Sequence, residues 1–82
     1  MIEVKNAQYK EDYKIWLEFS DGSAGIVDLK NELWGKVFEP LKDINVFKRF
    51  RLSEVINSIE CENGADLAPE FLYEKLNKNK NG

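Results

Sequence analysis

A strict period-two alternation restricts what this chain can fold into more than any other feature. From residue 13 to residue 19, apolar side chains occupy every odd position, with Lys14, Trp16 and Glu18 between them. This pattern is typical of a strand with one buried face. Ser20-Asp21-Gly22 then marks a turn, and residues 25–29 form the returning strand. The segment therefore predicts an antiparallel hairpin.

The type of turn decides which residues of this hairpin face each other. A two-residue Asp21-Gly22 turn would place Leu17 opposite Ile26. A loop of residues 20–22, with its glycine in the left-handed conformation, would place Ile15 opposite Val27. We favour the second register because it gathers the apolar residues of both strands on one buried face.

The rest of the chain predicts a small α+β domain. Residues 2–9 resemble a first strand, and Asp43 is suited to cap a helix over 44–50. Two further strands are expected near 51–53 and 58–62. Asp66, Pro69 and Glu70 have the signature of a helix start. We expect a two-layer, mainly antiparallel domain over residues 1–76, in the order β-β-β-α-β-β-α, with helices on one face. Residues 77–82 are expected to be a disordered tail.

Charge argues against nucleic acid as a partner of this domain alone. The net charge is −3, and residues 1–41 hold five lysines against eight acidic residues. A nucleic-acid binder needs a basic face to contact phosphates and release counterions. Lys48, Arg49 and Arg51 form the one basic cluster, which is short and is better explained as a solvated surface.

Reactive side chains are scarce, so we expect neither an enzyme nor a cofactor or metal site. The chain has no histidine, which removes the usual general base and a common metal ligand. Cys61 shares the inward phase of Ile59 and is expected to be a core residue. The carboxylate pair Glu60 and Glu62 lies on the solvated phase of the same strand.

Cellular location is expected to be the cytoplasm. A single cysteine excludes an intramolecular disulfide, which suits a reducing compartment. The first residues lack the pattern of a signal peptide, and no apolar stretch is long enough to span a bilayer. We therefore expect no membrane association.

Four apolar residues indicate a partner-binding surface. In the favoured register, Trp16 and Ile26 are neighbours on the face of the hairpin opposite the core. Trp34 and Phe38 lie in an irregular segment with Gly35 and nearby proline. Exposed aromatics in such a setting suggest an interaction surface. The alternative is that a helix or the 31–41 segment covers the second face and buries them.

Several blocks of the chain together resemble a bacterial family catalogued as domain of unknown function 2442. The blocks are residues 19–22, 27–29 and 38–41 and, above all, 63–73, which include Asn63, Gly64, Asp66, Pro69 and Glu70. Family members often have tryptophan-proline or a similar pair before the Asn-Gly, where this chain has Cys61-Glu62. No role of that aromatic residue is therefore inherited.

The resemblance implies a small α+β fold without established activity, and an arrangement beside a second small gene similar to a toxin–antitoxin pair. We expect an interaction or regulatory module, antitoxin-like, that binds the product of an adjacent gene or forms a homodimer. Charge complementarity could serve such binding. The competing hypothesis is a ligand-binding or enzymatic domain with a pocket near Asp66 and Glu70.

Overall fold

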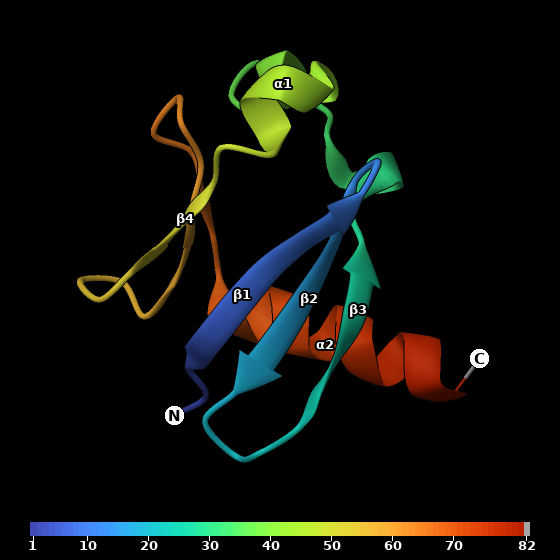
Figure 1. The fold of residues 1–82 in the computed structure, drawn as a ribbon, viewed down its shortest axis with the longest axis vertical. Helices are drawn as coiled ribbons and strands as arrows, with labels where there is room; N and C mark the ends of the chain where they lie inside the picture. Colours follow the sequence, from blue (N-terminus) through green and yellow to red (C-terminus); the bar gives the residue numbers. More distant parts are fainter. Residues whose placement is uncertain (82) are drawn as a thin grey trace.

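The first three strands form an antiparallel sheet. The computed structural model describes the backbone of residues 1–81 and the side chains of residues 1–78. Strands β1 (Val4–Glu11), β2 (Lys14–Phe19) and β3 (Ala24–Asp28) pair in the order β1-β2-β3 (Figure 1). The odd-numbered residues of β2 are buried, as their alternation predicts.

The register of the hairpin is the one favoured from the sequence. Ile15 faces Val27 and Trp16 faces Ile26. The amide of Phe19 donates to the carbonyl of Ser23, which leaves residues 20–22 as the loop. Gly22 has a φ of +90°, in the region that glycine adopts without steric cost. The three-residue loop is therefore confirmed.

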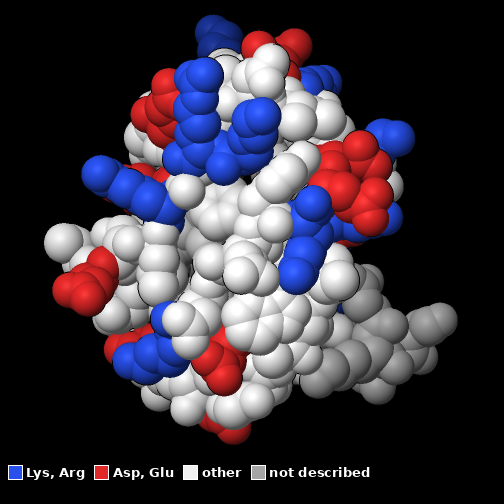
Figure 2. Space-filling view, viewed as in Figure 1, with Lys and Arg blue, Asp and Glu red and all other residues white. Residues whose placement is uncertain are grey.

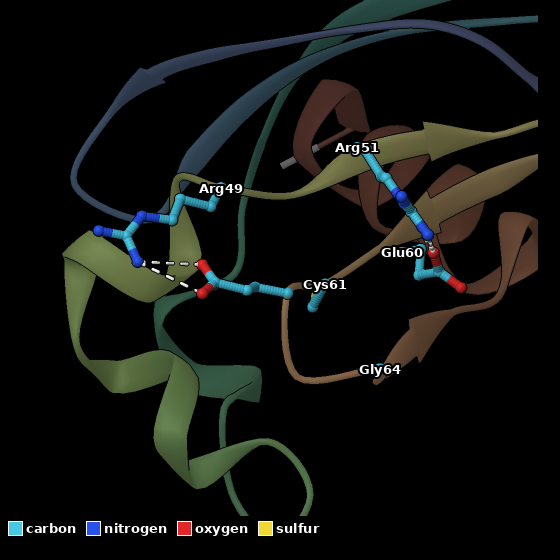
Figure 3. A pocket seen from close by; sticks show the side chains of 6 residues that line it. Arg49, Arg51, Glu60, Cys61 and Gly64 are labelled. Carbon is cyan, nitrogen blue, oxygen red and sulfur yellow. Dashed lines mark hydrogen bonds and ion pairs between the residues drawn. The ribbon is translucent and has the colours of Figure 1, made fainter.

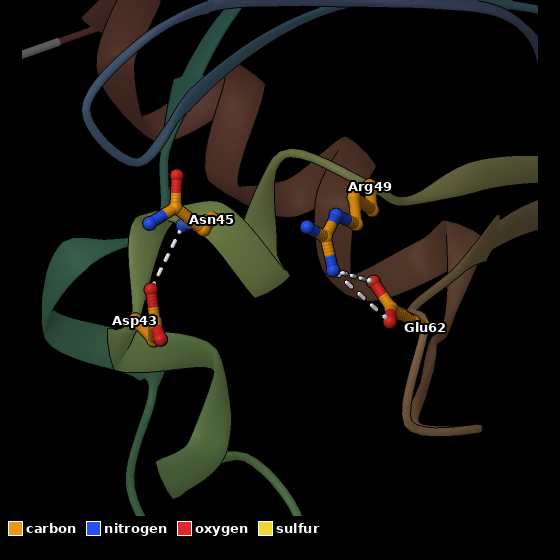
Figure 4. Close-up of polar contacts among 4 residues, drawn as sticks. All are labelled: Asp43, Asn45, Arg49 and Glu62. Carbon is orange, nitrogen blue, oxygen red and sulfur yellow. Dashed lines mark hydrogen bonds and ion pairs between the residues drawn. The ribbon is translucent and has the colours of Figure 1, made fainter.

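The middle of the chain forms short helical turns and a second, smaller sheet. Helical turns η1 (Lys30–Glu32), η2 (Glu39–Lys42) and α1 (Ile44–Phe47) follow β3. The Asp43 side chain accepts a hydrogen bond from the Asn45 amide at 3.0 Å, so its predicted capping role is confirmed (Figure 4). Strands β4, β5 and β6 then pair in that order, spanning Arg51–Ser53, Ser58–Glu60 and Asp66–Leu67.

Helix α2 (Pro69–Asn81) covers one face of the first sheet. In Figure 1 it runs behind β1, β2 and β3, and its far end extends past β3. Leu72 and Leu76 are buried on its inner side, and Leu76 lies directly against Gly25. The Tyr73 hydroxyl donates to the Asp21 carboxylate at 2.6 Å, which joins the helix to the hairpin loop.

One apolar core connects both sheets and the helix. Its buried members come from β1, β2, β3, the central turns, β5, β6 and α2. No buried side-chain polar atom among the described residues lacks a hydrogen-bond partner. The predicted α+β class is therefore confirmed, and the predicted element order matches approximately: a sixth strand, β6, precedes the last helix, and the strands are divided between two sheets. Within residues 1–81, no helix combines the length and apolar character needed to cross a bilayer.

Some local predictions differ from the structure. The helix capped by Asp43 ends at Phe47, short of residue 50. Asp66 does not cap the last helix, because it pairs with Glu60 in β6 and the helix begins at Pro69. Helix α2 also continues to Asn81, through most of the segment 77–82 expected to be disordered, while residue 82 lies outside the described part. Lysine and asparagine are tolerated in helices, and no proline or glycine interrupts 77–81.

Candidate functional site

The four residues predicted to form one partner-binding patch lie in two separate places. Trp16 and Ile26 face each other across β2 and β3 on the side opposite α2. Trp34 and Phe38 instead line a groove with residues at the start of α2. The sheet therefore separates the two pairs. Ile26 and Trp34 are exposed, whereas Trp16 and Phe38 are partly buried.

The groove beside Trp34 has a mainly apolar lining. It encloses about 320 Å³. Three of its lining residues are aromatic: Trp34, Phe38 and Phe71. The full lining comprises Glu32, Trp34, Phe38, Asp66, Leu67, Ala68 and Phe71. Trp34 keeps 71% of its surface exposed, so the groove has an indole at its rim that the fold does not bury.

A chain reversal holds Trp34 and Phe38 on the same wall. Gly35 has a φ of +87°, and its carbonyl accepts hydrogen bonds from the amides of Phe38 and Glu39. The turn thereby brings Phe38 back beside Trp34 and leaves Val37 57% exposed. A residue with a side chain at position 35 would be strained in this conformation.

Asn63 connects this segment to the second sheet. Its side-chain amide donates to the Val37 carbonyl at 2.7 Å, and its side-chain oxygen accepts from the Ala65 amide at 3.2 Å. Gly64 follows with a φ of +88° and donates to the carbonyl of Cys61. The Asn63-Gly64 pair therefore turns the chain between β5 and β6 and anchors the wall of the groove.

Two carboxylates lie along the groove, and they differ in their partners. Glu32 accepts a hydrogen bond from Lys75 Nζ at 2.8 Å, which ties η1 to α2. Asp66 makes no side-chain ion pair or hydrogen bond with any described residue. Glu70 lies in the first turn of α2, where a negative charge is favoured, but it does not line the groove. The groove therefore offers one unpaired carboxylate.

Phe71 lines this groove, and the sequence analysis did not identify it as a site residue. Leu72 and Leu76, four residues apart, form the buried stripe, and Phe71 is displaced from it by one position. Because Phe71 is one position away from the buried residues, the sequence could have indicated that its side chain lies at the side of the helix. Nothing in the sequence shows that Leu67 and Ala68 lie beside Trp34.

A second hollow, of about 350 Å³, lies over β4 and β5, and most of its lining residues are charged (Figure 3). Arg49 Nη1 lies 3.2 Å from a carboxylate oxygen of Glu62 (Figure 4), and Arg51 Nε lies 2.8 Å from Glu60. These two arginines belong to the basic cluster of the sequence, and their charges are balanced by acidic neighbours.

Cys61 borders the same hollow, yet its chemistry is that of a core residue. Its side chain is buried and makes no disulfide. Burial, with the nearby carboxylates of Asp66 and Glu60, raises the pKa of its thiol to about 11. Because the thiolate is the reactive form, this cysteine is a poor nucleophile near neutral pH. Among the described residues, no group of three or more potential ligands is arranged to hold a metal ion.

Comparison with known proteins identifies a family. A family model described as "Protein of unknown function (DUF2442)" matches residues 4–78, which covers all the strands and most of α2. No curated protein and no solved structure matches the chain.

Proposed function

The chain belongs to the DUF2442 family of proteins of unknown function, and on that premise we propose that it is a binding module that holds a segment of a partner protein in the groove beside Trp34. This proposal takes the domain to be a non-catalytic, cytoplasmic protein. The main observation that supports this proposal is the exposed indole of Trp34 at the rim of an apolar groove.

The energy available from Trp34 is large. A tryptophan buries up to about 250 Å². With 71% of its surface exposed, roughly 180 Å² remains for a partner to cover. At about 25 cal/mol per Å², this area contributes about 4 kcal/mol of apolar burial. Aromatic anchors of this kind dominate the energetics of protein interfaces.

Charge favours a particular kind of segment. The chain carries a net charge of −3, and Asp66 lies unpaired along the groove. A segment with an apolar side chain for the groove and a lysine or arginine beside it would match both features. Complementary charge would steer the encounter and help to exclude acidic segments.

The family resemblance suggests which protein to test first. In a two-gene arrangement, the partner is the product of the adjacent gene, and an acidic antitoxin-like module would mask a basic surface on it. This version of the proposal is narrower than the groove itself, because a different partner with the same chemistry would occupy the same site.

The experiment is a titration of the purified domain with the adjacent gene product, followed by calorimetry. Trp34→Ala is expected to weaken binding by about 30-fold or more, the effect of losing an interfacial anchor. Val55→Ala is the matched control, because Val55 is 92% exposed and does not line the groove. Urea unfolding of both variants establishes that each is folded.

Two results would contradict the proposal at different levels. If the adjacent gene product does not bind, a library of displayed peptides replaces it as the probe, and only the antitoxin-like version is lost. If no apolar and basic peptide is enriched, or if Trp34→Ala and Val55→Ala bind equally well, the groove is not the binding site.

A further inference from the structure

The free edge of β3 presents unpaired backbone groups. Hydrogen bonds from Phe19 to Ser23 and from Leu29 to the Tyr13 carbonyl mark the two ends of the β2–β3 ladder. Since hydrogen-bonded pairs alternate along an antiparallel ladder, residues 25 and 27 face β2. The N–H and C=O groups of Ala24, Ile26 and Asp28 therefore point away from β2. No hydrogen bond from another described residue reaches the backbone of these three.

The opposite edge of the sheet is protected, and β3 is not. The pairing of β1 contains two register irregularities, and its Val4 amide donates to the carbonyl of Asn57. By contrast, β3 pairs in an unbroken register and contains no proline and no lysine. Natural proteins usually protect edge strands with such devices, because an unprotected edge is a template for another strand.

The face beside this edge is suited to an apolar neighbour. Ile26 is 48% exposed and lies in one cross-strand row with Trp16. In Figure 2, the middle of the face that the sheet turns to the viewer carries few charges, and lysines, arginines and acids gather around it. An added strand would continue this row with its own side chain.

The charge of Asp28 favours a partner segment over a second copy of the domain. A second copy paired antiparallel about a two-fold axis at Ile26 would place its Ala24 opposite Asp28, because residues 24 and 28 are equally far from that axis. The carboxylate of Asp28 would then face no basic side chain across the new strand pair. A segment of a different protein can present a lysine or arginine at that position.

We propose that the free edge of β3 binds an extended segment of a partner protein as a fourth, antiparallel strand. The chemistry of the segment follows from cross-strand neighbours. A basic residue would face the exposed carboxylate of Asp28, and an apolar residue two positions later would face Ile26. The required pattern is therefore basic–x–apolar, read from the N-terminus. This surface shares no residue with the groove beside Trp34, so neither proposal depends on the other.

The test uses the acetylated and amidated peptide Thr-Lys-Thr-Ile-Thr-Val-Thr, titrated into the full chain and followed by amide NMR. We expect the amides of Ala24, Ile26 and Asp28 to shift and to become protected from exchange. A peptide of the same sequence, N-methylated at Lys, Ile and Val, is expected to leave these three amides unshifted and unprotected, because it cannot donate to the edge.

Variants separate this site from other surfaces. Ile26→Lys is expected to weaken binding by about ten-fold, through lost apolar contact and repulsion from the peptide lysine. The matched control Val55→Lys adds the same charge elsewhere and is expected to bind normally. Asp28→Lys is expected to prefer a peptide with glutamate in place of lysine.

Three results would overturn the proposal. The first is an N-methylated peptide that shifts and protects the three edge amides as the parent peptide does. The second is a titration that leaves the three edge amides unchanged. The third is a concentration-dependent dimer that protects the same amides without peptide, which would identify a second copy as the occupant.

Discussion

Gly25 is the position at which a single added methyl group tests how the helix packs on the sheet. A Cβ atom at this residue would lie 2.6 Å from Leu76 Cδ1 and 3.8 Å from Leu76 Cγ. Leu76 is 2% exposed, so its side chain cannot move out into solvent. The φ of Gly25 is not positive, and alanine is therefore acceptable to the backbone.

The expected cost of Gly25→Ala follows from that contact. Carbon atoms in protein cores normally approach to about 3.5–4.0 Å, so the new methyl overlaps Leu76 by about 1 Å. Overpacking of this kind costs about 1–3 kcal/mol. Alanine also restricts the unfolded chain more than glycine does, and this lower conformational entropy offsets about 0.4–1 kcal/mol of the destabilisation. We expect the free energy of unfolding to fall by about 1–2 kcal/mol.

A double-mutant cycle measures the coupling directly. Urea unfolding, followed by tryptophan fluorescence, is measured for Gly25→Ala, Leu76→Ala and the double variant. Leu76→Ala alone is expected to cost about 2–5 kcal/mol and to leave space for the new methyl. In that background Gly25→Ala should be neutral or slightly stabilising. Equal destabilisation in both backgrounds would refute the contact between α2 and β3.

Three further predictions concern stability and titration. Asn63→Ala removes both side-chain hydrogen bonds and should cost about 1–2 kcal/mol in urea unfolding, whereas Asn63→Asp should retain the bond from Ala65 and cost less. Burial raises the pKa of the Cys61 thiol from 9.0 to about 11. Its contribution to the free energy of unfolding is therefore complete below pH 9 and is lost as pH rises through 11. Urea unfolding of Cys61→Ala should not show this loss at alkaline pH. Hydrogen bonds from Ser23 and Tyr73 lower the pKa of Asp21 from 3.8 to about 2, so the stability it adds is present above pH 3.8 and lost as pH falls toward 2. An NMR titration of Asp21 should move to higher pH in Tyr73→Phe.

Local patterns predicted the hairpin because each of its determinants lies within a few residues. The alternation of β2 specifies its buried face, and only the loop with a left-handed Gly22 aligns that face with Val27. The cap at Asp43 is local in the same way. Such features depend on backbone sterics and on side chains close in sequence.

The groove could not be predicted, because its walls come from segments far apart in the chain. Trp34 and Phe71 are joined there only by tertiary packing. The assignment of Asp66 was wrong for a related reason. Its side chain resembles a helix cap, but pairing with Glu60 placed it in a strand, so a long-range contact outweighed a local preference.

The exposed apolar residues are not left over from an incomplete core. The core is closed around residues such as Leu17 and Phe47, and the described residues leave no buried polar side-chain atom unpaired. Trp34 and Ile26 consequently add little to folding, and Trp34→Ser and Ile26→Thr should change the unfolding free energy by less than about 0.5 kcal/mol. The two surfaces also differ in what they offer a partner, since the groove provides side-chain area and the β3 edge provides backbone hydrogen bonds. A loss of 2 kcal/mol or more in either variant, well above the roughly 0.5 kcal/mol of a surface change, would assign that residue to the core and remove the physical basis for a binding role there.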